Sequence, residues 1–348
     1  MCGIVGYVGY DEAAGKIIEG LKKLEYRGYD SSGIAILSDK GIELNKCKGE
    51  IKNLENMIAG RVPSGTCGIG HTRWATHGAP SDVNSHPHMD QSGRVALVHN
   101  GIVENYVELK EALINEHGIK FKSETDSEVI AQLIGVKYNA NGGDLEKAVY
   151  DATKEMRGTY AIGVIAEDTP NKIVAYRKEA PLIAGLGKKS NFIASDIPAL
   201  LKYTNDIFLI ENDEMVICTP DSITIKDKDG KEVKREAMKI TWSVEDAEKG
   251  GYEHFMLKEI NEQPKVVAET LNRRIDEDGK IKLDGINLTK EELDKYNKIY
   301  IVACGTAYHA GLVGKYVIEK MAGIAVEVDV ASEFRYRNPF IDEKTLFI

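Results

Sequence analysis

The chain has 348 residues, of which 43% are hydrophobic and 29% charged, and its formal net charge is −10. This composition is typical of a globular protein of about two domains and excludes collagen-like and low-complexity chains. The acidic balance argues against partners such as nucleic acid or an anionic membrane surface. No apolar run reaches the roughly 18 residues of a membrane-spanning helix. Five widely spaced cysteines without a CxxC pair predict a reducing, cytoplasmic environment.

The first hundred residues alternate between strand and helix patterns. Residues 4–8 form a short apolar run bounded by glycines, which indicates a buried strand, and Asp11 is a candidate cap for the amphipathic helix that follows. Residues 32–47 have the pattern of a hairpin, and two more buried strands are expected at 66–71 and 95–99.

Helical patterns follow at 104–116, 125–138 and 144–155, and residues 159–227 are rich in short apolar runs and turn residues. Strands and helices thus come in blocks, which favours an α+β domain over a simple array of βαβ units. We place the end of this first domain at about residue 240.

The remaining residues have a different pattern. A polar, glycine-containing stretch suits a linker, a long helix follows, and an apolar strand, a helix and a second strand then predict a βαβ unit of a parallel sheet. The chain stops inside a third predicted strand, so we expect it to be a fragment of a longer protein. In chain order these elements are a linker from 241, a helix at 253–275, strands at 299–303 and 324–328 around a helix at 305–321, and a strand at 345–348.

Cys2 is a candidate nucleophile. If Met1 is removed, the α-amino group of Cys2, with a reference pKa of about 7.7–8.0, lies beside its own thiol and can act as a general base. A cysteine in second position is, on its own, more often a small buried residue of a strand. Other residues are needed to distinguish a nucleophile from such a structural cysteine.

A loop at residues 71–78 (HTRWATHG) is rich in binding groups. Arg73 offers the bidentate donor that suits a carboxylate, and Trp74 can exclude water. An ordinary polar loop is the alternative. Arg27 lies where a helix gives way to a loop, and alone it predicts a structural ion pair.

Two further segments allow a structural and a functional reading. The amide of Asn100 and the backbone N–H of Gly101 are the donors of an oxyanion hole, but Asn-Gly is also a turn signal. Asp126 can pair with a substrate ammonium, or it can simply be an acidic residue at the start of a helix capped by Ser123 or Thr125.

Four histidines lie between residues 71 and 88 and raise the question of a metal site. Their spacing fits no common zinc pattern, and no thiol or carboxylate accompanies them. We therefore predict no metal and no other cofactor.

Six segments taken together resemble the glutaminase domain of the class II, N-terminal-nucleophile, glutamine amidotransferases. The resemblance extends into residues 302–311 and 331–339, which resemble the start of the sugar-isomerase (SIS) domain in the glucosamine-6-phosphate synthase branch of that family. The six segments are MCGIVGYVG, LEYRGYDSSG, HTRWATHG, NSHPH, VHNG and SETDSE.

The resemblance implies a role for each candidate residue. Cys2 would attack the side-chain amide of L-glutamine, Asn100 and Gly101 would hold the oxyanion, and Arg27 would support Cys2. Trp74 would gate the ammonia that is released. The remaining residues would bind the substrate: Arg73, Thr76 and His77 its α-carboxylate, and Asp126 its α-ammonium.

For the second domain the resemblance implies only part of a sugar-phosphate site. Cys304, Gly305 and Thr306 would form its near wall, while the other family residues would follow the end of this chain. Ala307 stands where many relatives carry serine, so the resemblance implies one hydroxyl contact to the sugar fewer than in those relatives. The full-length enzyme would be a homodimer that uses the ammonia to convert fructose 6-phosphate to glucosamine 6-phosphate, and this chain is expected to retain the glutaminase step alone.

The implied fold is a four-layer αββα domain at 1–240, a linker and connecting helix at 241–295, and an incomplete three-layer α/β SIS domain at 296–348. Two alternatives stay open. The chain could belong to another class II amidotransferase, although neither a phosphoribosyl-diphosphate loop nor an SGGxDS motif is present. It could also be a non-catalytic glutamine or sugar-phosphate sensor if Met1 is retained.

Overall fold

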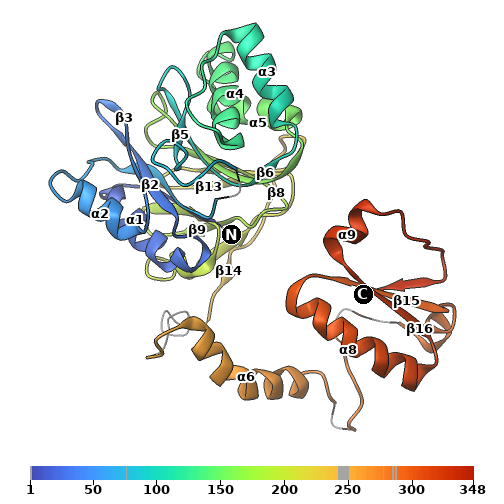
Figure 1. The fold of residues 1–348 in the computed structure, drawn as a ribbon. Coiled ribbons are helices and arrows are strands. Elements are labelled where there is room, and N and C mark those ends of the chain that lie inside the picture. The colour runs from blue at the N-terminus through green and yellow to red at the C-terminus, as the bar shows by residue number, and fades with distance from the viewer. Residues whose placement is uncertain (1, 76, 242–250, 277, 284–285, 287) are drawn as a thin grey trace. The chain divides into compact units, whose positions relative to one another are not determined.

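The computed structural model describes residues 2–75, 77–241, 251–276, 278–283, 286 and 288–348. The chain divides into two compact units, Met1–Gly251 and Tyr252–Ile348 (Figure 1). Among the described residues, no helix has both the length and the apolar character needed to cross a membrane.

Two antiparallel sheets form the centre of the first unit. One has eight strands in the order β14-β11-β9-β10-β1-β4-β2-β3, and the other has six in the order β13-β12-β8-β7-β6-β5. The eight-stranded sheet contains β1 (Gly3–Gly9), β2 (Ser31–Ser38), β3 (Gly41–Lys48), β4 (Cys67–Arg73), β9 (Ile183–Leu186), β10 (Ser190–Ala194), β11 (Asp206–Leu209) and β14 (Met238–Lys239). The six-stranded sheet contains β5 (His88–Met89), β6 (Val95–Val103), β7 (Gly158–Ala166), β8 (Ile173–Lys178), β12 (Glu214–Cys218) and β13 (Ile223–Lys226).

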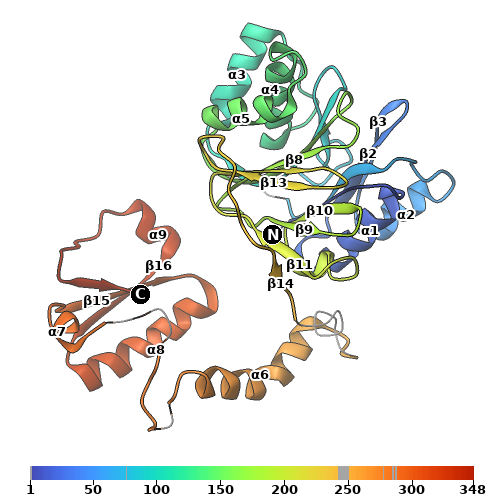
Figure 2. The same cartoon turned by 180° about the vertical axis from the view of Figure 1, so that it is seen from behind.

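Helices cover the outer face of each sheet, so the unit has four layers (Figure 2). An apolar cluster that includes Ile4, Ile69 and Val98 fills the space between the sheets, and two further clusters lie between each sheet and its helices. The predicted αββα fold is confirmed. The helices are α1 (Ala13–Lys23) and α2 (Ile51–Ile58) on the eight-stranded sheet, and α3 (Tyr106–His117), α4 (Asp126–Ala140) and α5 (Leu145–Glu155) on the six-stranded sheet.

Short 3₁₀ turns and helix ends place several site residues. The turn η1 (Glu25–Arg27) follows α1, and η2 (Ile197–Ala199) follows β10. Thr125 caps α4 by accepting a hydrogen bond from the backbone N–H of Glu128, as predicted. The predicted cap of α1 is wrong: Glu12, not Asp11, occupies the N-cap position, and its carboxylate accepts from the backbone N–H of Gly65 instead.

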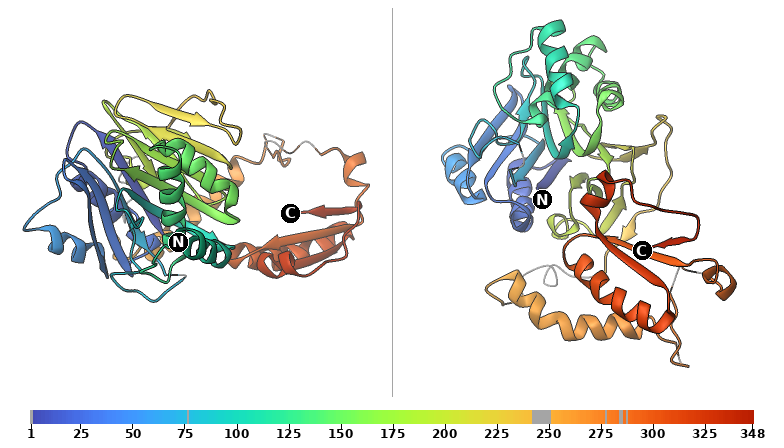
Figure 3. Two further views of the ribbon diagram at one scale, coloured as in Figure 1. Left: turned by 90° about the horizontal axis from the view of Figure 1, so that it is seen from above. Right: turned by 45° about the vertical axis from the view of Figure 1, so that its right-hand side comes forward.

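The second unit contains a parallel sheet in the order β16-β15-β17, and α8 packs on one of its faces (Figure 3). The predicted βαβ unit is confirmed. Most of the predicted linker, residues 242–250, lies outside the described residues. The elements are α6 (Phe255–Asn272), α7 (Lys290–Leu293), β15 (Lys298–Ala303), α8 (Gly305–Ala322), β16 (Ala325–Val330), α9 (Ala331–Tyr336) and β17 (Thr345–Phe347).

Candidate active site

A cavity of about 360 Å³ in the first unit collects nearly all of the residues predicted to act on glutamine. They come from segments that are far apart in the sequence but meet where β1, β4 and β6 and the start of α4 lie close together. Thr76 lies outside the described residues. The predicted residues that line the cavity are Cys2, Arg27, Arg73, Trp74, His77, Asn100, Gly101 and Asp126.

Cys2 directly precedes β1, a central strand of the eight-stranded sheet. Its Sγ accepts a hydrogen bond from the backbone N–H of Trp74 at 3.2 Å and lies 3.4 Å from the carbonyl oxygen of the same residue. Burial raises the pKa of the Cys2 thiol above its usual value, and this effect outweighs the hydrogen bond to Trp74. The thiol therefore needs a base beside it before it can act as a nucleophile.

Asn100 and Gly101 lie within β6, not in a turn, because both residues pair with β7. The Nδ2 of Asn100 donates to the carbonyl oxygen of Cys2 at 3.1 Å, so its amide is beside the candidate nucleophile. Gly101 has a φ of +123°, and a Cβ there would lie 2.0 Å from the carbonyl oxygen of Thr159. Only glycine fits this backbone position.

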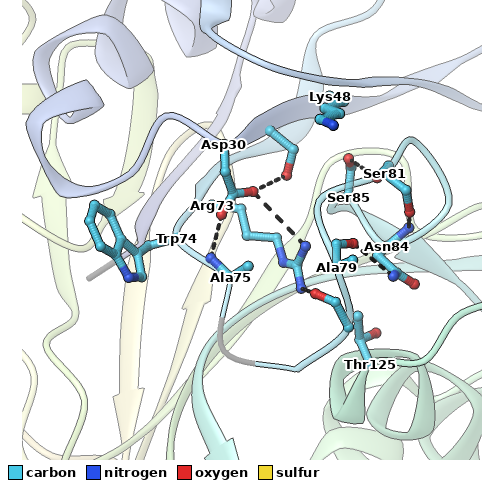
Figure 4. A network of polar contacts seen from close by, with 12 residues as sticks. Asp30, Lys48, Arg73, Trp74, Ala75, Ala79, Ser81, Asn84, Ser85 and Thr125 are labelled. Atoms are coloured by element: carbon cyan, nitrogen blue, oxygen red, sulfur yellow. Dashed lines mark hydrogen bonds and ion pairs between the residues drawn. The ribbon is translucent and has the colours of Figure 1, made fainter.

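Arg73 ends β4 and is almost completely buried. Its Nη2 donates to the carbonyl oxygens of His77 and Gly78, and its Nη1 lies 3.9 Å from Oδ1 of Asp30 (Figure 4). This Nη1 is buried and makes no hydrogen bond within the described structure. A buried guanidinium with an unused donor is well suited to receive a carboxylate.

Asp126 begins α4 and is 3% exposed. Its Oδ2 accepts from the backbone N–H of Val103 at 3.0 Å, and its Oδ1 accepts from the hydroxyl of Ser127 at 3.3 Å. The cavity thus presents a buried anion and the buried cation of Arg73, the pair that a zwitterionic amino acid requires.

Arg27 forms an ion pair, as its position alone predicts, and Trp74 is half-exposed. Nη1 of Arg27 forms an ion pair with Asp196 at 2.5 Å, which joins η1 to the residue that precedes η2. Trp74 is 51% exposed and packs edge-on against Tyr29 with 5.8 Å between ring centroids.

Sequence reasoning missed Asp30. Its carboxylate accepts hydrogen bonds from the backbone N–H of Ala75 and from the hydroxyl of Ser31, and it lies beside Arg73 (Figure 4). It therefore fixes the chain directly after Arg73 and Trp74. Its place inside the motif LEYRGYDSSG was the one available signal.

The sequence did not predict that four buried histidines form a cluster, of which His86 and His99 line the cavity. The rings of His71 and His86 stack at 4.1 Å, and His86 also contacts the rings of His88 and His99. Burial lowers the pKa of all four, to about 3 for His71, so the imidazoles are neutral at pH 7. Among the described residues, no group of three or more His, Cys, Asp or Glu could hold a metal ion.

The candidate sugar-phosphate residues lie in the second unit, where β15 leads into α8. Cys304 occupies the N-cap position of α8 without a side-chain hydrogen bond, and Gly305 has a φ of +58°. Cys304, Gly305 and Thr306 are all exposed. The geometry is that of an open βα junction.

Comparison with known proteins identifies both units. The sequence profile of the glutamine amidotransferase domain matches residues 71–202, and that of the SIS domain matches residues 292–348. Over all 348 residues the chain is 58% identical to a glutamine–fructose-6-phosphate aminotransferase (isomerizing) of Clostridium tetani and 57% identical to one of Clostridium perfringens. The chain spans 57% and 56% of the length of these two relatives.

A solved structure supports the fold. The chain is similar to the glutamine phosphoribosylpyrophosphate amidotransferase of B. subtilis, complexed with ADP and GMP, with a TM-score of 0.57 and 21% identity. The alignment covers 94% of this chain and 65% of that one. At this identity the likeness bears on the fold alone.

Proposed function

Because this chain is a homologue of the glutamine–fructose-6-phosphate aminotransferases and carries a glutamine amidotransferase domain followed by the start of a SIS domain, we propose that it hydrolyses L-glutamine to glutamate and ammonia with Cys2 as the nucleophile. One observation carries the proposal. The thiol of Cys2, the amide of Asn100, and the buried charges of Arg73 and Asp126 all face one cavity.

Glutamine binds through its two charged groups. Its α-carboxylate takes the unused Nη1 donor of Arg73, and its α-ammonium pairs with Asp126. Thr76 and His77 are proposed as further ligands of the α-carboxylate. The side-chain amide then reaches Cys2. Because both charged partners are buried, an amino acid that lacks either charge leaves one of them unpaired, and its binding is weakened.

The reaction proceeds in two steps once Met1 has been removed. The α-amine of Cys2 takes the thiol proton, and the thiolate attacks Cδ of glutamine to form a tetrahedral intermediate. The amide of Asn100 and the N–H of Gly101 stabilise its oxyanion. The amine returns the proton to the leaving nitrogen, ammonia departs, and a γ-glutamyl thioester remains. Water then attacks the thioester and releases glutamate and the free thiol.

The raised pKa of the Cys2 thiol favours a mechanism in which the α-amine removes the thiol proton before the sulfur attacks glutamine. A thiol that is protonated at pH 7 depends on a neighbouring base, and a free α-amine has a reference pKa of about 7.7–8.0. Arg27, held by Asp196, supports the backbone around Cys2. Trp74, half-exposed at the rim, gates the departure of ammonia.

We extend the proposal to the whole protein on the strength of the relatives' names. There the ammonia would aminate fructose 6-phosphate and yield glucosamine 6-phosphate, and Cys304, Gly305 and Thr306 would border the sugar. We propose the domain limits 1–240, 241–295 and 296–348, a homodimer of the full-length protein, and a cytoplasmic location in keeping with five free cysteines.

The test is an intact mass spectrum after treatment with 6-diazo-5-oxonorleucine, an electrophilic glutamine analogue. We expect a single adduct on protein that lacks Met1, blocked by excess glutamine and absent from Cys2→Ala, which should stay folded and release no glutamate. If des-Met protein binds glutamine by calorimetry but neither reacts with the analogue nor turns over glutamine, the protein is a glutamine sensor and not an enzyme.

A further inference from the structure

His71 is a fully buried residue of β4 that contacts the amide of Asn100 across the space between the two sheets. Its Nε2 lies 2.9 Å from Oδ1 of Asn100 and 3.0 Å from the carbonyl oxygen of His99. The other ring nitrogen, Nδ1, is buried and makes no hydrogen bond within the described structure.

The surrounding carbonyl groups determine which atoms carry hydrogen. The carbonyl oxygen of Cys2 can only accept, so the amide of Asn100 must turn its Nδ2 toward it. The Oδ1 of Asn100 then faces His71. With two acceptors in front of it, Nε2 of His71 must be the protonated nitrogen.

The ring of His71 has little freedom to leave this arrangement. It stacks on His86 with 4.1 Å between centroids and 14° between planes. His86 is itself held, because its Nδ1 accepts from the backbone N–H of His99 at 3.3 Å. The backbone of His86 is also packed directly against Gly33 of β2, because a Cβ on Gly33 would lie 2.2 Å from the carbonyl oxygen of His86.

We propose that His71 is a positioning residue for glutamine hydrolysis: it donates from Nε2 to the amide oxygen of Asn100 and so keeps the N–H groups of that amide toward the oxyanion site. The inference rests on the proposed function. An amide that rotated by 180° would present its oxygen to the developing oxyanion and oppose the reaction. His71 itself is not among the described residues that line the cavity, so it acts through Asn100.

If His71 positions Asn100, loss of its N–H donor should lower kcat and leave KM for glutamine nearly unchanged. Removal of a single oxyanion donor typically lowers kcat by about 10²–10³-fold. His71→Phe keeps the buried ring and loses the donor, so we expect kcat to fall by about 10–100-fold while KM for glutamine changes less than about threefold. His71→Gln retains an N–H donor of similar reach and should recover most of the lost kcat.

A double-mutant cycle separates positioning from packing. In an Asn100→Ala background His71→Phe should have no further effect on kcat, because the amide that it orients is gone. Ile69→Val, a buried change on the same strand within the apolar cluster between the sheets, is the control for packing and should leave kcat unaltered. An equal loss of kcat from His71→Phe in both backgrounds would overturn the proposal.

A spectroscopic measurement on the unaltered protein tests the same idea without a variant. Long-range ¹H–¹⁵N correlation of the His71 ring should report the neutral, Nε2-protonated tautomer, and an Nδ1-protonated ring would refute the proposal. If des-Met protein releases no glutamate, the proposed function fails and takes this inference with it. Normal turnover together with the wrong tautomer overturns the inference alone.

Discussion

The backbone N–H of Trp74 donates to Sγ of Cys2 at 3.2 Å, although the two residues are 72 positions apart. The contact exists because the end of β4 and the start of β1 are neighbours in one sheet. Gly28 approaches the same backbone, and it is close enough that a Cβ there would lie 2.7 Å from the nitrogen of Trp74.

Gly28→Ala should therefore damage the site. The added methyl must displace the backbone of Arg73 and Trp74 and with it the hydrogen bond to Sγ of Cys2. Since displacements of about 1 Å can cost around 10²-fold in rate, we expect kcat/KM for glutamine to fall at least about tenfold. Gly15→Ala is the control, because a Cβ in that helix meets nothing within 4 Å. A Gly28→Ala enzyme as active as the control would contradict the argument.

Most of the fold could be predicted because the apolar periodicities were clear. The helix patterns at 104–116, 125–138 and 144–155 correspond to α3, α4 and α5, and the hairpin at 32–47 corresponds to β2 and β3. The residues of the site could be predicted to meet only through the resemblance of six motifs, since no local pattern shows that residues 2 and 126 lie beside one cavity.

The failures have physical causes in long-range contacts. The strand expected at 95–99 extends to Val103, because Asn100 and Gly101 pair with β7 despite their turn signal. Asp11 has the better capping side chain, but the backbone N–H of Ala13 bonds to the carbonyl of Gly65, and the helix begins after Glu12. The histidine cluster forms only when β4, β6 and the intervening loop come together, which no spacing along the chain reveals.

Substitution of Asp126 can distinguish a role in substrate binding from a purely structural role. Asp126→Asn retains an oxygen that can accept from Val103 but removes the charge that would pair with the α-ammonium of glutamine. We expect KM for glutamine to rise about 30-fold or more, because an unpaired buried charge costs about 2–5 kcal/mol. Asp144→Asn, at the exposed start of α5, is the matched control and should leave KM unaltered. If Asp126→Asn lowers the stability of the protein but leaves KM normal, Asp126 only stabilises the start of α4 and does not bind glutamine.

The buried histidines should make the first unit sensitive to acid. Their pKa values in the folded state lie below the unfolded value of about 6.5, so below that pH the unfolded chain binds more protons and stability falls. Each neutral histidine contributes a slope that is about 0.7 kcal/mol per pH unit at pH 6.5 and approaches about 1.4 kcal/mol per pH unit near pH 5.5, provided that the pH stays above its folded pKa. Urea unfolding at pH 5.5 and 6.5 measures it. His88→Gln should remove one histidine's share of the slope, and an unchanged slope would show that His88 is protonated in the folded state.

Arg73 tests how the α-carboxylate is held. Its Nη2 fixes the loop through the carbonyls of His77 and Gly78, while its buried Nη1 has no hydrogen bond to a described residue. Arg73→Lys keeps the charge, but its ammonium cannot bind the two loop carbonyls and the α-carboxylate at the same time, because it lacks the planar fork of a guanidinium. We expect KM for glutamine to rise at least about tenfold, with a smaller change in kcat. Arg94→Lys, which alters a half-exposed ion pair with Asp168, is the control and should leave both constants unaltered. If Arg73→Lys binds glutamine as tightly as the control, the α-carboxylate does not bind at Arg73, and the assignment of the cavity to a free amino acid loses its cation.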